Sequence, residues 1–356
     1  MPFGSGYGAR NYAQDKAIID TDFRRFWFGI LMLLIVAFPF IAGSYYVHLI
    51  NHVAIVCIGA LSLNILTGVS GQISLGHAGL LCAGAFTAAL VGEQAGLPFW
   101  AVVPIAGMVT GIIGLIMGLA CFRLRMLYMI LGTLAVHFLI VYIATIIQAR
   151  AGVIVGFSIS NPNLGPIVFD TSQKWYFLLV VIVGIITVVC VNLVRSRTGR
   201  AWMAIRDRDI AASALGVNVA FYKLLAFVFS SVLAGIAGSL HAYYGAYASA
   251  EEWTFWIGIM YVAMIVIGGL GSILGSFLGA IFVTLLPYVI SAILGVLPIP
   301  DTFMMLRFAV EFSVFGILIV VFLLVEPGGL TAIWIRIRSF FQLWPFKFKP
   351  LVATRK

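Results

Sequence analysis

Charge is scarce in this sequence. Asp, Glu, Lys and Arg make up only 9% of the 356 residues and hydrophobic residues make up 63%, whereas an ordinary soluble domain carries about 25% charged residues. A soluble globular protein is therefore excluded. The apolar residues form long runs, and a membrane-spanning helix needs about 20 of them. The sequence predicts an all-α integral membrane protein with about ten transmembrane helices and no sizeable soluble domain.

Several chemical motifs are also missing. None of the lysines follows a glycine, so the chain has no P-loop for binding a nucleotide. It contains neither an HExxH sequence nor a supported GxSxG elbow, and its apolar runs hold few acidic side chains for acid–base catalysis. The four cysteines lie in apolar stretches without CxxC spacing, which indicates neither a zinc site nor a disulfide framework. We expect no enzyme activity, no metal and no cofactor bound by this chain.

The positions of the basic residues predict a topology. The net charge of +9 does not indicate a nucleic-acid partner, because the basic residues are spread between apolar runs, as they are in cytoplasmic loops of membrane proteins. Eighteen of the 21 basic residues fall within residues 10–25, 123–125, 195–223 and 336–356. These segments all lie on the same side of the membrane if the chain crosses it ten times. The predicted spans are 26–47, 49–66, 72–92, 98–121, 126–147, 175–194, 222–248, 254–270, 273–296 and 304–325. Both termini are then cytoplasmic, with an N-terminal segment at 1–25, a transmembrane domain at 26–326 and a basic tail at 327–356.

The stretch from Asn64 to Gly79 is unusually polar and rich in glycine. Polar groups are costly at membrane depth and such a backbone tends to break a helix, which suits a site lining a protein-enclosed cavity. Half-helix ends are one way to present hydrogen-bond donors to a substrate carboxylate. We expect a substrate pathway lined by Asn64, Thr67, Gln72, Ser74 and His77. A structural role remains open, in which the glycines allow close helix packing and His77 contacts a carbonyl; residues 72–92 could cross fully or re-enter.

Other features allow more than one interpretation. A second glycine-rich run at 268–279 hints at an internal repeat, with the pathway between the two runs, but its GxxxG spacings favour simple helix packing. Arg307 and Glu311 are four residues apart and are expected to form a structural pair. His48 and His52 also share a helix face, but no acidic or cysteine ligand lies near them in sequence, so a metal site is not favoured.

The connection from 195 to 221 contains a predicted cytoplasmic helix at 201–218. Its composition is rich in alanine, and Gly216 is a suitable stop for the helix. Apolar residues at Ile205, Ile210 and Leu215 form a stripe, with charged residues elsewhere. A short amphipathic helix outside the membrane usually lies against lipid head groups or a partner protein.

Seven motifs together resemble the inner-membrane permeases of bacterial branched-chain amino acid ABC transporters, of the LivM type within the LivH/LivM permease family. They follow one another in order over most of the chain and comprise Leu63–Gly79, Arg197–Ala201, Ala204–Gly216, Tyr222–Phe227, Ala234–Leu240, Gly268–Gly275 and Glu326–Leu330. The resemblance implies an ABC importer permease architecture in the bacterial cytoplasmic (inner) membrane. It implies a subunit that imports Leu, Ile or Val.

The resemblance also implies partners. These are two ABC ATPase subunits that use ATP and Mg²⁺, a second homologous permease of the LivH type, and a periplasmic or lipid-anchored solute-binding protein. In related importers a helix beginning Glu-Ala-Ala, with a glycine four residues after the second alanine, docks on the ATPase. Ile210 replaces that glutamate here, and the spacing to Gly216 is kept. The resemblance thus implies that 201–218 is the coupling helix, which connects the ATPase to the membrane domain. It assigns ATPase contact to Arg206, Asp207, Asp209, Ala211, Ala212 and Gly216.

Two departures from the family pattern bear on the substrate. The outer loop lacks the usual Thr-Gly-Gly run and reads Ala149–Ser158, and Gly328 stands where the end motif usually has arginine. The same architecture importing urea, short amides or other amino acids therefore remains an alternative. An ion-coupled secondary transporter is a further alternative, for which the membrane-buried pair Arg307 and Glu311 would carry the coupling ion.

Overall fold

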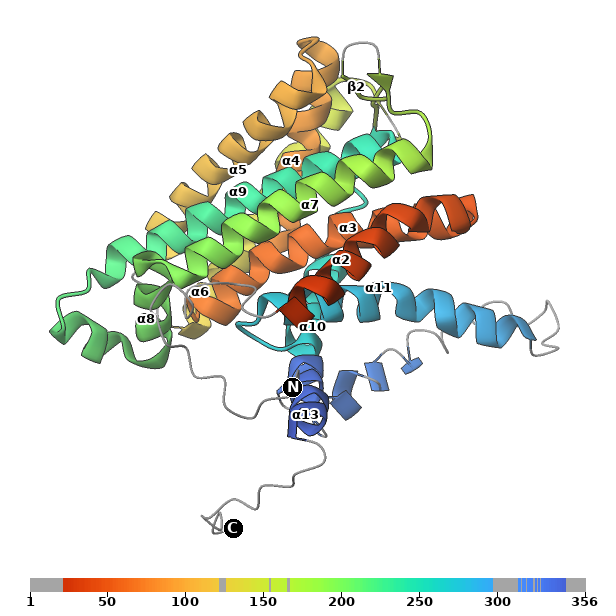
Figure 1. Cartoon of the computed structure of the whole chain (residues 1–356). Coiled ribbons are helices and arrows are strands. Elements are labelled where there is room, and N and C mark those ends of the chain that lie inside the picture. Colours follow the sequence, from red (N-terminus) through yellow and green to blue (C-terminus); the bar gives the residue numbers. More distant parts are fainter. Residues whose placement is uncertain are drawn as a thin grey trace, which may run out of the picture.

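The computed structural model describes residues 22–121, 126–153, 155–164, 167–296 and 328–343, with isolated residues between 313 and 326. The described chain is almost entirely helical (Figure 1), which confirms the all-α prediction. Within it, six helices are long and apolar enough to cross a membrane, at Ser44–Val69, Phe99–Ala120, Tyr128–Arg150, Ser172–Arg195, Val219–Gly245 and Ile273–Ile293. Gly29–Ile41 and Phe255–Gly268 are shorter apolar helices.

The elements follow one another along the chain with short connections. The helices are α2 (Asp22–Ile41), α3 (Ser44–Asn64), the π-helix η1 (Ile65–Val69), α4 (His77–Thr87), the π-helix η2 (Ala88–Gln94), α5 (Phe99–Cys121), α6 (Met126–Arg150), α7 (Ser172–Arg195), α8 (Arg197–Ala214), α9 (Val219–Gly245), α10 (Phe255–Gly268), α11 (Ile273–Val296) and α13 (Gly329–Leu343). Two antiparallel strand pairs join β1 (Phe157–Ser158) to β4 (Tyr247–Ala248), and β2 (Asn163–Leu164) to β3 (Ile167–Val168).

Two helix boundaries differ from those expected. The first two spans divide at Gly43, whose backbone is extended, rather than at residue 48. Hydropathy could not locate this boundary, because apolar residues lie on both sides of it. The helix α10 has 14 residues, which at 1.5 Å per residue is shorter than the hydrocarbon core of a bilayer. The expected span at 304–325 lies largely outside the described residues, as do Arg307 and Glu311.

Glycine allows the central helices to pack closely. In Figure 1 the axes of α5, α9, α7 and α3 are nearly aligned. A Cβ atom on Gly238 of α9 would lie 2.0 Å from the carbonyl oxygen of Leu81 in α4, and one on Gly84 would lie 2.4 Å from the carbonyl oxygen of Gly235. Only glycine permits such approaches between helix backbones. The most enclosed of the six candidate spans is Ser44–Val69. In its most apolar stretch of 18 residues, 78% of the residues are buried.

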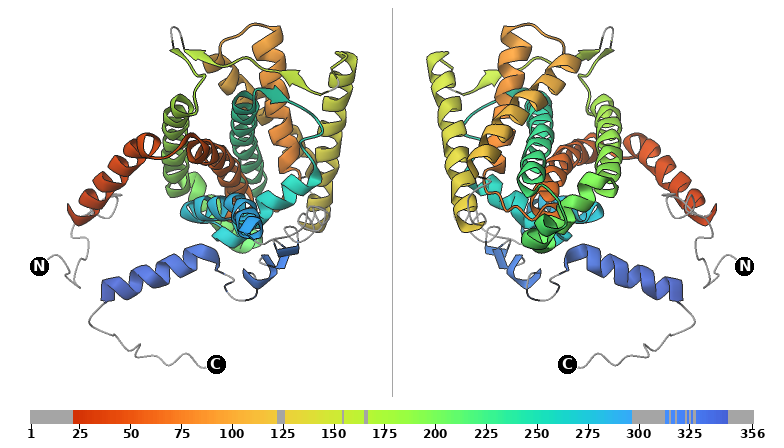
Figure 2. Two further views of the ribbon diagram at one scale, coloured as in Figure 1. Left: turned by 90° about the vertical axis from the view of Figure 1, so that its right-hand side faces the viewer. Right: turned by 90° about the vertical axis from the view of Figure 1, so that its left-hand side faces the viewer.

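The connections gather at two ends of the helix bundle. At one end Glu93 accepts hydrogen bonds from the backbone N–H and the hydroxyl of Ser160, both at 2.6 Å, and β1 pairs with β4. At the other end the helix α8 contacts residues 68–71, and Gly329 lies against Gly269. Figure 2 shows the short strands and α13 at opposite ends of the molecule. The segments expected outside thus lie together, apart from those expected in the cytoplasm.

Candidate transport pathway and cytoplasmic helix

The predicted helix break is present at residues 70–76, between η1 and α4. Gly71 adopts a positive φ of 75°, which glycine reaches without steric cost. The hydroxyl of Thr67 donates to the carbonyl of Gln72 at 3.1 Å, and that of Ser70 donates to the carbonyl of Leu66 at 2.7 Å. Thr67 thus satisfies a backbone carbonyl within the break, and Ser70 adds a second donor to the Leu66 carbonyl, which also accepts the N–H of Gln72 at 3.0 Å.

Asn64 joins the two glycine-rich runs. Its side chain is buried, and its amide nitrogen donates to the carbonyl of Ser272 at 2.8 Å and to the hydroxyl of Ser276 at 2.7 Å. Its amide oxygen accepts the backbone N–H of Gly271 at 2.9 Å. A Cβ atom on Gly68 would lie 2.0 Å from that amide oxygen. The sequence hints at a pathway between the two runs but not at this direct connection, because the partners are more than 200 residues apart.

The remaining predicted pathway residues are packed inside the protein. The amide nitrogen of Gln72 donates to Ser70 Oγ at 2.9 Å and to the carbonyl of Lys223 at 3.1 Å. Ser74 Oγ accepts the N–H of Gly76 at 3.3 Å. The ring of His77 bonds the carbonyl of Gly59 at 2.9 Å and Ser62 Oγ at 3.2 Å.

Two polar side-chain atoms in this stretch take part in none of these hydrogen bonds. Gln72 Oε1 and His77 Nδ1 are buried and have no hydrogen-bond partner in the part of the chain that the structure describes. The contact of His77 with a carbonyl is the one expected for a structural role. A pathway role for Asn64, Thr67, Gln72, Ser74 and His77 stays a prediction.

The helix α8, which was predicted to be cytoplasmic, begins at Arg197, four residues before the predicted start. Ser196 caps it by accepting the N–H of Thr198 at 3.2 Å. The backbone leaves helical geometry at Arg208, with φ −158° and ψ 105°. Gly216 has a φ of 85° and donates its N–H to the carbonyl of Ser213 at 2.9 Å, so the predicted glycine stop is confirmed.

The side chains of α8 have different surroundings. Trp202 is fully buried and donates its indole N–H to the carbonyl of Tyr222 at 2.8 Å, and Ala212 is also buried. By contrast, Ile210 is 84% exposed, and Leu215, which directly follows the helix, is 85% exposed. An open groove of about 490 Å³ runs beside them, lined by Asp209, Ile210, Ser213, Ala214 and Val219. Asp207, Ala211 and Gly216 are exposed as well.

Arg206 turns toward the membrane domain. Its guanidinium donates a hydrogen bond to the carbonyl of Gly68. A Cβ atom on Gly71 would lie 3.1 Å from the Arg206 backbone, and one on Gly271 would lie 2.6 Å from Arg206 Nη1. Lys223 of α9 adds an ion pair with Asp209 at 3.5 Å. Arg206 thus fixes α8 to the helix break and to both glycine-rich runs.

The motif at 326–330 positions α13 against the second glycine-rich run. Gly329 has a φ of 68°, and a Cβ atom on it would lie 2.6 Å from the carbonyl oxygen of Ile267. The hydroxyl of Thr331 donates to the carbonyl of Gly268 at 2.6 Å. Glu326 pairs with Arg336 at 3.0 Å. The sequence of the motif gives no indication of the contact with Gly268.

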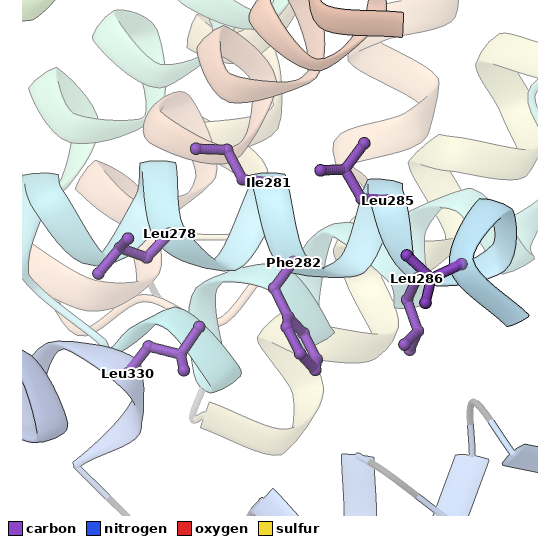
Figure 3. A pocket seen from close by; sticks show the side chains of 7 residues that line it. Leu278, Ile281, Phe282, Leu285, Leu286 and Leu330 are labelled. Atoms are coloured by element: carbon purple, nitrogen blue, oxygen red, sulfur yellow. The ribbon is translucent and has the colours of Figure 1, made fainter. Parts of the chain in front are cut away.

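A purely apolar cavity lies between α11 and the start of α13. It has a volume of about 380 Å³ and is lined by Leu278, Ile281, Phe282, Leu285, Leu286, Val289 and Leu330 (Figure 3). All of its lining residues that the structure describes are apolar. Such a cavity can hold lipid tails or apolar side chains, but it offers nothing to bind the charged groups of an amino acid.

The fold and the site define a multi-pass membrane protein in which a broken helix lies next to the short helix α8, as in a transport subunit. Residues 45–323 match the family described as branched-chain amino acid transport system / permease component, and the chain belongs to this family. The family assignment confirms the resemblance found in the sequence.

Two relatives are similar to this chain. They are the high-affinity branched-chain amino acid transport system permease proteins LivM of Salmonella typhimurium (strain LT2) and Escherichia coli (strain K12), which are 31% and 32% identical to it. Each alignment covers 70% of this chain and 65% of the relative, so the match spans slightly less than two thirds of the relatives' length. No solved structure gives a significant match.

Proposed function

We propose that this chain is the permease subunit of an ATP-driven ABC importer that moves branched-chain amino acids into the cytoplasm across a bacterial inner membrane. Family membership and the names of the two LivM relatives support the cargo. Two ATPase subunits would hydrolyse ATP with Mg²⁺. A second permease of the LivH type and an external solute-binding protein would complete the assembly.

The exposed apolar face of α8 is the observation that carries this proposal. Ile210 and Leu215 are among the most exposed large apolar side chains described, and they adjoin a groove outside the spans. Apolar groups exposed together in this way usually mark a contact surface. The part of α8 that precedes the break in its geometry at Arg208 is fixed to the membrane domain through Arg206. A partner bound at Ile210 and Leu215 could therefore move the helix break in that domain.

The topology in this proposal is ten spans with both termini cytoplasmic. Three arrangements support it. The helix formed by α4 and η2 runs from the break to Glu93, which contacts the outer loop; this favours a full crossing over a re-entrant turn. Gly329 lies against Gly269, so the chain that leaves along α11 has returned to the same end where α13 begins. The expected cytoplasmic segments contain most of the basic residues.

Copurification tests the proposal directly. The chain is isolated from its native membrane in mild detergent, and the proteins that accompany it are identified by mass spectrometry. We expect a P-loop ATPase and a second permease. Absence of an ATPase from a complex that still transports would support the secondary transporter. Uptake of urea or an amide, but not of leucine, by the reconstituted complex would support the alternative cargo.

A further inference from the structure

The helices α3 and α9 meet along a polar seam. His48 Nδ1 and Tyr244 Oη are 2.6 Å apart, the rings of His52 and His241 are 5.8 Å apart between centroids, and Ser230 Oγ donates to the carbonyl of Ser62 at 2.9 Å. As residue numbers rise along α3 they fall along α9, so the helices are antiparallel. The contacting positions recur at helical spacing, which places them on one face of each helix.

The seam connects the outer end of the bundle with the helix break. His48 and His52 lie toward the outer end of α3, and two turns further on are Gly59 and Ser62, which bond the ring of His77. Polar and ionisable groups inside a membrane domain are expensive and are usually retained for function. Most of α3 is apolar and buried, so the polar contacts near the two ends of this helix face call for a function.

An acidic group joins the seam at its outer end. Glu252, between β4 and α10, has its carboxylate 2.5 Å from His241 Nε2, and the two side chains are 22% and 23% exposed. The same carboxylate raises the pKa of the Tyr247 phenol above its ordinary value. Trp253 packs edge-on against His241 with ring centroids 5.2 Å apart. Its side chain is 3% exposed, and its indole N–H has no partner in the described chain.

We propose that Glu252, His241, His52 and Trp253 form an outer binding site for a zwitterion, which carries one ammonium and one carboxylate group. This proposal rests on the import of amino acids proposed above and assigns the groups that recognise the cargo. The ligand's ammonium replaces His241 on the Glu252 carboxylate. The released imidazole N–H and the unused indole N–H of Trp253 then donate to the ligand's carboxylate.

This exchange keeps the charges balanced. The hydrogen bond between His241 and Glu252 is replaced by bonds from both groups to a ligand of zero net charge, so no charge is left buried without a partner. A neutral amide such as urea has no ammonium for Glu252 and no carboxylate for His241. The site therefore favours an amino acid over the alternative cargo.

Ligand binding to the intact transporter in detergent tests the site. The probes are L-leucine, leucinamide, which lacks the carboxylate, and urea, each measured by saturation-transfer NMR. The variants are Glu252→Gln and His241→Gln, with Glu251→Gln as the matched control because Glu251 is the adjacent, exposed acid. We expect leucine to bind at least about tenfold more weakly to both site variants, as expected for the loss of a charge-assisted hydrogen bond, and normally to the control.

Unchanged leucine binding in Glu252→Gln would overturn the site, as would equal binding of leucine and urea to the unmodified protein. If one variant does not fold, judged by size-exclusion chromatography, the other decides the matter. The binding measurement does not require the ATPase. If no ATPase copurifies, the proposed function is contradicted but the site is not. If both variants bind and transport leucine normally, the site is contradicted but the proposed function is not.

Discussion

Arg206 is a residue through which α8 could act on the membrane domain. Its guanidinium bonds the carbonyl of Gly68 and lies against Gly271, so it contacts both glycine-rich runs. We predict that Arg206→Ala lowers substrate uptake per ATP hydrolysed by about tenfold, within the usual range of coupling free energies, while the ATPase still copurifies. Parallel measurements of uptake and phosphate release in proteoliposomes check this.

Arg200→Ala provides the control for this residue. Arg200 lies on the same helix, but its guanidinium bonds the carbonyl of Arg195 at 3.0 Å, close by in sequence. Its removal leaves the contact with Gly68 in place, so uptake per ATP is expected to stay normal. A normal ratio in Arg206→Ala would show that the bond to Gly68 does not transmit the movement of α8.

The close contact of α9 with α4 depends on single glycines. A Cβ atom on Gly238 would lie 2.0 Å from a backbone oxygen, which cannot rotate away as a side chain could. We predict that Gly238→Ala destabilises the protein by about 1–3 kcal/mol, the usual cost of overpacking. Gly184→Ala in α7 is the control, because nothing lies within 4 Å of its added Cβ. Thermal unfolding in detergent, followed by tryptophan fluorescence, should show a lower midpoint for Gly238→Ala only.

At the scale of a helix, the outward face of α8 has its own test. We predict that the double variant Ile210→Glu with Leu215→Glu abolishes copurification of the ATPase, because two charges would replace apolar groups in the contact surface. Ile210→Val with Leu215→Ile keeps the surface apolar and should copurify normally. Ala212 and Gly216 are less suitable, since Ala212 is buried and Gly216 has a positive φ. Full recovery of ATPase with the double glutamate variant would contradict docking at this face.

The sequence predicted local features of these elements better than contacts between them. The helix break and the stop at Gly216 depend on glycines and polar residues that lie side by side in the chain, so they were visible as patterns. The seam between α3 and α9 was not, because His52 and His241 meet only after the helices pack. The inward direction of Arg206 also escaped prediction, since Arg208 gives no sequence signal for the change in helix direction.

For the whole molecule, the predicted topology can be tested by cysteine labelling. The native cysteines Cys57, Cys82 and Cys190 are buried, and Cys121 can be replaced by serine, so the background is low. Four exposed positions then report the side on which their segments lie, namely Leu97, Val155, Met203 and Ser339. Each is changed to cysteine and treated with a membrane-impermeant thiol reagent.

Leu97→Cys and Val155→Cys should react in spheroplasts, because their segments belong to the end that carries Glu93 and the β1–β4 pair. Met203→Cys and Ser339→Cys should react only after permeabilisation, because basic residues cluster around both positions. Reaction of Ser339→Cys from outside, with Met203→Cys protected, would mean an odd number of crossings after α8. Both termini could not then be cytoplasmic, and α13 could not lie at the end of the bundle where the proposal places the ATPase.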